Sequence, residues 1–108
     1  MKRGDIITVA VNGDYGKPRP ALVIQSDSLP ETDSVLVCLL TTTLRDAPLY
    51  RLPLPANPET GLRNPSHVMV DKIVAVRRDR CGPPIGRADS PSLFTLSRLL
   101  AFTIGIAD

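Results

Sequence analysis

Tryptophan is absent from this sequence, and its aromatic residues, two tyrosines and two phenylalanines, make up 4% of 108 residues. The chain also has only two cysteines, whose spacing fits neither a disulfide framework nor a metal site with four ligands. Cys38 lies within an apolar run, and Cys81 lies in a loop rich in glycine and proline. We therefore expect both thiols to be reduced and without a functional role.

Long hydrophobic runs are missing as well. The longest, residues 35–40 and 99–102, are far shorter than the roughly twenty residues that span a bilayer, and Asp5 precedes the first apolar segment, which is not typical of a signal peptide. The chain carries 13 basic and 11 acidic residues, and this net charge of +2 permits a polyanionic partner without requiring one. These features predict one domain spanning residues 1–108, no membrane contact and a cytoplasmic location.

Short segments rich in β-branched residues alternate with loops rich in glycine, proline and polar residues, which predicts five or six strands. Residues 35–40 are apolar on both faces and are expected at the centre of the sheet, whereas Pro53 confines residues 49–54 to an edge. Asp71 and Lys72 interrupt residues 68–76, which predicts one bent strand or two adjoining strands. The other expected strands span residues 6–11 and 21–24.

A single helix is predicted after residue 89. Ser90 is the expected N-cap, Pro91 fits the first helical position, and Gly105 marks the end. Four leucines between these signals share one helical face: Leu93, Leu96, Leu99 and Leu100. The sequence therefore predicts a mainly β (α+β) fold, a small antiparallel barrel with a C-terminal helix packed on it.

Arg19 and Thr41 are the first candidates for a functional site. If residues 21–24 and 35–40 form neighbouring antiparallel strands, these two side chains meet at one edge of the sheet. Pro18 and Pro20 restrict the backbone around Arg19 and give its guanidinium a fixed direction. A guanidinium suits the oxygens of a phosphate, and a hydroxyl adds a hydrogen bond. Both residues also fit a plain surface role, because an arginine beside a strand is most often solvated or ion-paired.

Other polar residues fit two interpretations each. His67 fits an acid–base group or a structural histidine, and Asp71 fits a substrate contact or an ion pair with Lys72. A basic cluster within residues 77–86 is typical of a solvated loop: Arg77, Arg78 and Arg80. The sequence shows no glycine-rich phosphate loop, no cluster of metal ligands and no Ser-His-Asp arrangement.

Three segments carry a pattern that spans nearly the whole chain. They are Arg-Gly-Asp-Ile at residues 3–6, Gly-Lys-Pro-Arg-Pro and the apolar strand after it within residues 16–27, and the strand that ends in Thr41 and Thr42. Residues 66–73 add weaker support. Together these segments resemble the MazF, Kid and PemK family of toxins from bacterial type II toxin–antitoxin systems.

This resemblance implies a small SH3-like barrel of the CcdB and MazF type, assembled as a homodimer. It also implies an endoribonuclease, an mRNA interferase, that cuts single-stranded RNA at specific short sequences without a metal or cofactor. In this family the ribose 2′-hydroxyl attacks the adjacent phosphate and leaves a 2′,3′-cyclic phosphate and a 5′-hydroxyl. The implied partner and inhibitor is an acidic antitoxin that folds on binding.

The resemblance assigns catalytic roles to Arg19 and Thr41, which are expected to stabilise the negative charge on the phosphate. The general base stays open among three candidates: Asp14, Asp71 and His67. Family members that use the aspartate matching Asp71 have an arginine two residues earlier, where this chain has Met69.

Contacts with RNA are expected from residues on either side of this site: Lys17, Tyr15, Thr42, Arg77 and Arg78. Tyr15 is the expected stacking platform, and because aromatic residues are few, base recognition is expected to rely on hydrogen bonds. Two alternatives have the same fold. One is a gyrase poison of the CcdB type, which ends in Trp-Gly-Ile where residues 103–108 of this chain contain no tryptophan. The other is a non-catalytic module that binds RNA or protein.

Overall fold

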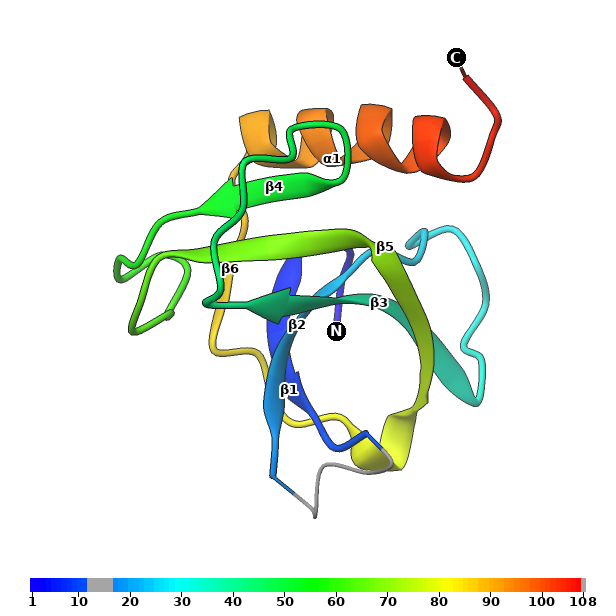
Figure 1. Ribbon diagram of the computed structural model, residues 1–108. Helices are drawn as coiled ribbons and strands as arrows, with labels where there is room; N and C mark the ends of the chain where they lie inside the picture. Colours follow the sequence, from blue (N-terminus) through cyan, green and yellow to red (C-terminus); the bar gives the residue numbers. More distant parts are fainter. Residues whose placement is uncertain (12–16, 108) are drawn as a thin grey trace.

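Six antiparallel strands form one curled sheet, with a helix packed against it, in a computed structural model that describes residues 1–11 and 17–107 (Figure 1). The strands are β1 (Asp5–Val9), β2 (Arg19–Val23), β3 (Ser34–Thr41), β4 (Arg51–Leu54), β5 (Ser66–Arg77) and β6 (Gly86–Arg87). A short 3-10 turn, η1 (Arg78–Arg80), follows β5, and the helix is α1 (Ser90–Thr103). The spatial order of the strands is β4-β5-β3-β2-β1-β6, which confirms the predicted antiparallel barrel with a C-terminal helix.

The position of each strand follows from its side chains. β3 is apolar on both faces and lies between β2 and β5, and β4, which contains Pro53, forms one edge, so both predictions are confirmed. β5 is one bent strand, as the interruption by Asp71 predicted. Its register with β3 shifts between the Leu40–Val68 pair and the Cys38–Ile73 pair, so that β5 has extra residues there. Figure 1 shows the bend, which curls the sheet.

The loop after β4 closes the curled sheet onto β6. The backbone N–H of Arg87 in β6 donates to the carbonyl of Glu59 in this loop, with the two atoms 2.8 Å apart. The sequence predicted only a loop over residues 77–86, so the prediction was wrong for η1 and for the start of β6. A strand of two residues, one of them Gly86, has no alternation of apolar residues that could have revealed it.

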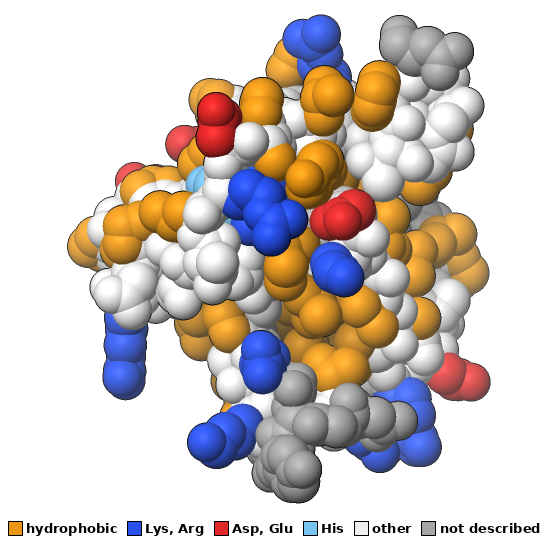
Figure 2. Space-filling view, in the orientation of Figure 1, with side chains coloured by type: hydrophobic (Ala, Val, Ile, Leu, Met, Phe, Trp, Pro, Cys, Tyr) orange, Lys and Arg blue, Asp and Glu red, His pale blue; other side chains and the backbone are white. Residues whose placement is uncertain are grey.

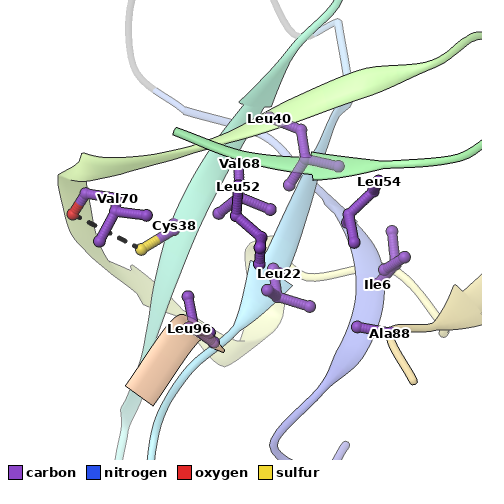
Figure 3. Close-up of a cluster of buried hydrophobic side chains, with 10 residues drawn as sticks. All are labelled: Ile6, Leu22, Cys38, Leu40, Leu52, Leu54, Val68, Val70, Ala88 and Leu96. Carbon is purple, nitrogen blue, oxygen red and sulfur yellow. Dashed lines mark hydrogen bonds between the residues drawn. The ribbon is translucent and has the colours of Figure 1, made fainter. Parts of the chain in front are cut away.

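Each face of the sheet has its own buried cluster. The cluster against α1 is drawn in Figure 3 and comprises Ile6, Leu22, Cys38, Leu40, Leu52, Leu54, Val68, Val70, Ala88 and Leu96. The opposite cluster comprises Ile7, Val9, Ala21, Val23, Val35, Val37 and Val76. Both cysteines are free thiols, as predicted. Burial, with a smaller contribution from the charge of Asp71, raises the pKa of Cys38 to about 12, so this thiol stays protonated near neutral pH.

Helix α1 packs on the sheet through the predicted leucines. Leu96 is fully buried, and Leu93, Leu99 and Leu100 pack at the margin of the same cluster. The N-cap is Asp89 rather than the predicted Ser90, because the Asp89 carboxylate accepts the backbone N–H of Ser92 at 2.8 Å. Hydrogen bonding to Ser92, through its side chain and then through this N–H, lowers the pKa of Asp89. Among the described residues, no helix is both long and apolar enough to cross a membrane.

The Arg-Gly-Asp segment joins the sheet to the region around α1. The N–H of Gly4 donates to the carbonyl of Val23 at 2.8 Å, and the carbonyl of Gly4 accepts the N–H of Ala88 at 2.9 Å. The neighbouring Asp5 is buried and forms an ion pair with Arg87. These contacts give the segment a structural role in this chain.

Replacing Gly4 by alanine is expected to lower the free energy of unfolding by about 1–3 kcal/mol. The φ angle of Gly4 is +95°, which side chains rarely allow, and an added Cβ would lie 2.8 Å from Cδ1 of Leu93. The measurement is urea unfolding, with Gly105→Ala as control. Gly105 has a φ of +81° but nothing within 4 Å of an added Cβ, so this variant tests backbone strain alone. Equal losses in both variants would mean that the contact with Leu93 costs nothing.

Candidate functional site

Arg19 and Thr41 line one pocket, where β2 begins and β3 ends. The last β2–β3 pair at this end joins Ala21 to Leu39, and the continued register places Arg19 opposite Thr41. Their predicted meeting at one edge of the sheet is therefore confirmed. The pocket has a volume of about 320 Å³. Its other lining residues are Pro20, Leu40, Thr42, Thr43, Ser66 and Met69.

Pro20 explains why this end of the sheet is open. Proline has no N–H and cannot donate to a neighbouring strand. Pairing between β2 and β3 accordingly stops at Ala21, although both strands continue past that point. Where β2 and β3 are no longer paired with each other, Arg19 and Thr41 line the same pocket.

The pocket combines one guanidinium with a group of hydroxyls. The Thr41 hydroxyl oxygen accepts the backbone N–H of Thr43 at 3.1 Å, which leaves the hydroxyl hydrogen for a ligand. Thr42 and Thr43 bring further hydroxyls, whereas the Ser66 hydroxyl donates to the carbonyl of Asn64 at 2.9 Å, and the described lining contains no Asp or Glu. Such a set of donors around a positive charge suits an anion. Thr43 and Ser66 were not predicted from the sequence, although the hydroxyl run that includes Thr41 continues to Thr43.

The candidate bases lie at different places. His67 is paired with Thr41 across β3 and β5, and its Nδ1 accepts the backbone N–H of Arg45 at 3.4 Å. His67 lines a different pocket, of about 500 Å³, together with Arg45 and Arg51, and is not among the residues that line the Arg19 pocket. Asp71 is exposed at the bend of β5 and does not line either pocket. Asp14 lies outside the described residues.

The residues predicted to contact RNA are separated in the structure. Thr42 lines the Arg19 pocket, and Lys17 is exposed two residues before Arg19. Arg77 pairs with Ser34, the first residue of β3, whereas Thr41 is the last, and the eight residues of β3 extend over about 25 Å. Tyr15 lies outside the described residues.

Arg77 and Arg78 have acidic neighbours of their own. Nη2 of Arg77 lies 2.8 Å from a carboxylate oxygen of Asp79, and Nε of Arg78 lies 3.9 Å from one of Glu31. The structure therefore does not bring these arginines together with Arg19, and their contact with RNA stays a prediction. On the face shown in Figure 2, basic side chains are scattered among hydrophobic ones and do not form one stripe.

Within residues 1–11 and 17–107, no group of three or more His, Cys, Asp or Glu side chains is arranged to hold a metal ion.

Comparisons with known proteins match this chain to one family. Residues 2–104 match the family described as "PemK-like, MazF-like toxin of type II toxin-antitoxin system". The chain is 43% identical to "Probable endoribonuclease MazF" from Mycolicibacterium smegmatis over 108 residues, which is 99% of each chain.

Solved structures share the fold. The structure titled "Endoribonuclease in complex with its cognate antitoxin from Mycobacterial species" has a TM-score of 0.81 and 21% identity, covering 100% of this chain and 98% of that one. The toxin MazF-mt6 from Mycobacterium tuberculosis has a TM-score of 0.80 and 24% identity, covering 94% and 96%. At these identities the likeness concerns the fold alone.

Proposed function

This chain belongs to the PemK-like, MazF-like toxins of type II toxin–antitoxin systems and is an endoribonuclease, and we propose that it cuts single-stranded RNA at short specific sequences without a metal. The observation that carries the proposal is the pocket that Arg19 and Thr41 share. In the proposed reaction the ribose 2′-hydroxyl attacks the adjacent phosphorus and the bond to the 5′-oxygen breaks. The products are a 2′,3′-cyclic phosphate and a 5′-hydroxyl.

Charge development determines the roles of Arg19 and Thr41. As the phosphate becomes pentacoordinate, its oxygens gain negative charge, which a fixed guanidinium stabilises more than it stabilises the ground state. The Thr41 hydroxyl donates to the same group of oxygens, because its own oxygen is oriented by the N–H of Thr43. The guanidinium thus provides the positive charge that a metal ion provides in other nucleases.

His67 is our choice of general base within the described residues. It is the strand neighbour of Thr41, whereas Asp71 lies beyond Met69 at the bend of β5. Imidazole is the side chain that proteins use most often for proton transfer. In this role a ring nitrogen of His67 accepts the proton of the 2′-hydroxyl as the oxygen attacks. Because a neutral imidazole has one acceptor nitrogen, the hydrogen bond from the N–H of Arg45 to Nδ1 must be released first.

Two protein partners belong to the proposal. A solved structure with this fold contains an endoribonuclease with its cognate antitoxin, and we propose an acidic antitoxin segment as the inhibitor of this chain. We also propose a homodimer, because Leu49, Phe94 and Phe102 are exposed and line one groove along α1. Apolar surface of this kind marks a protein interface.

The proposed function is tested with a mixed-sequence single-stranded RNA and its all-deoxy counterpart, both in excess chelator. We expect the RNA to be cut and the DNA to stay intact, since DNA lacks the attacking hydroxyl. Mass spectrometry of the fragments should show cyclic phosphate and 5′-hydroxyl ends. Cleavage of the DNA as well as the RNA, or RNA cleavage only after metal is added, would refute the mechanism. RNA that stayed intact across many sequences would refute the proposed enzyme activity and direct attention to gyrase inhibition.

A further inference from the structure

Arg51, the first residue of β4, carries a buried charge without an acidic partner. Arg51 is only 8% exposed, and its Nη1 donates to the carbonyl of Thr43 at 3.0 Å. Its Nε is buried without a hydrogen bond. No carboxylate oxygen of a described residue forms an ion pair with this guanidinium.

Such an arrangement is unfavourable for folding. A buried cation loses its hydration, and with one hydrogen bond and no counterion it regains little of that free energy. An apolar side chain of similar length in this position would avoid the cost. The stability of the fold therefore does not account for an arginine at position 51.

The contacts of Arg51 lead to the Arg19 pocket instead. The guanidinium binds the carbonyl of Thr43, whose N–H in turn orients the Thr41 hydroxyl. Across the β4–β5 ladder, Arg51 is paired with Met69, which also lines the pocket. Thr43 thus links the buried guanidinium of Arg51 to the Thr41 hydroxyl, which in the proposed function faces the phosphate.

We propose that Arg51 is a positioning residue for RNA cleavage: its guanidinium fixes the backbone of Thr43, so that the Thr41 hydroxyl donates to the scissile phosphate. This role rests on the proposed function. It explains the unpaired charge, because functional sites retain groups that cost stability where activity depends on them. The long reach of the guanidinium and its directed N–H groups suit a buried carbonyl.

The test is Arg51→Met, compared with the wild type in single-turnover cleavage of a short RNA that contains one cut site. At saturating protein we expect the cleavage rate constant to fall about ten- to a hundred-fold. The protein concentration for half-maximal rate should stay within about two-fold, because Arg51 is buried and the RNA contacts are elsewhere. The thermal unfolding midpoint should be equal to or higher than that of the wild type.

Two further variants make the comparison specific. Arg51→Lys retains a donor and a charge, and should recover part of the lost rate. Lys2→Met removes an exposed positive charge before β1, far along that strand from Val9, the partner of Arg19, and should leave the rate unchanged.

The outcomes separate the positioning role from the alternatives. A lower unfolding midpoint in Arg51→Met, or failure of this variant to fold, would overturn the proposal by assigning Arg51 to the stability of the fold. A wild-type cleavage rate in Arg51→Met would overturn it as well. If the wild-type chain cut no RNA, the proposed function itself would fail before any variant was compared.

Discussion

Replacing Arg19 by alanine is expected to reduce kcat/KM for RNA cleavage about 10²–10³-fold, the loss typical of a preorganised donor to transition-state charge. Arg19 is exposed at the start of β2, so its truncation should leave the unfolding transition unchanged. The loss should appear in the rate constant at saturating protein, because the charge that Arg19 stabilises develops during the reaction. Single-turnover cleavage of an RNA with one cut site measures it.

Related substitutions show which property of each side chain matters. Arg19→Lys retains the charge without the planar fork and should lie between the wild type and the alanine variant. Thr41→Ser retains the hydroxyl and should cut faster than Thr41→Ala. Lys2→Met serves again as the control for loss of a distant positive charge. If Arg19→Ala cleaved RNA at the wild-type rate, Arg19 would have no role in the chemistry.

Replacing Leu96 by alanine is expected to lower the free energy of unfolding by about 2–5 kcal/mol. Leu96 is the one residue of α1 that is fully buried, and it packs into the cluster on the helix side of the sheet. A domain of this size has a total stability of about 5–15 kcal/mol, so the variant loses a large share of it. Urea unfolding measures the change through the midpoint of the transition.

Leu29→Ala is the matched control for Leu96→Ala because it makes the same chemical change at an exposed position. Leu29 is 52% exposed, and its truncation should cost less than about 0.5 kcal/mol. Similar losses in the two variants would show that Leu96 is not central to the packing of α1. A change in the slope of the transition, rather than its midpoint, would indicate an altered denatured state.

Local patterns predicted most of the elements. The apolar residues of β3 on both faces, Pro53 in β4 and the leucine face of α1 each have a single favourable environment, so their places in the fold followed from composition and spacing. One error occurred where a short-range signal had a competitor. Asp89 and Ser90 can both cap a helix, and the hydrogen bond to Ser92 decides for Asp89.

The candidate site, like the fold, could be predicted from the sequence only in part. Arg19 and Thr41 could be brought together from the sequence, because antiparallel pairing of two recognisable strands sets their register. The separation of Arg77 and Arg78 from Arg19 could not, since it depends on the length of β3 and on acidic residues brought near by folding. The position of Asp71 could not be predicted either, because it lies within the bend where the register of β5 with β3 shifts.

The order of residues along the chain thus specifies the strands, the helix and the pair of residues at the centre of the proposed chemistry, since these depend on side chains close in sequence or on one simple register. The burial of Arg51 beneath the Thr43 carbonyl has no such local cause. The sequence around it offers only an arginine before an apolar strand, a pattern typical of a solvated side chain. Arg51 is buried where β4 pairs with β5 and where its guanidinium meets the carbonyl of Thr43 in the β3–β4 loop, and that environment depends on contacts between separate segments.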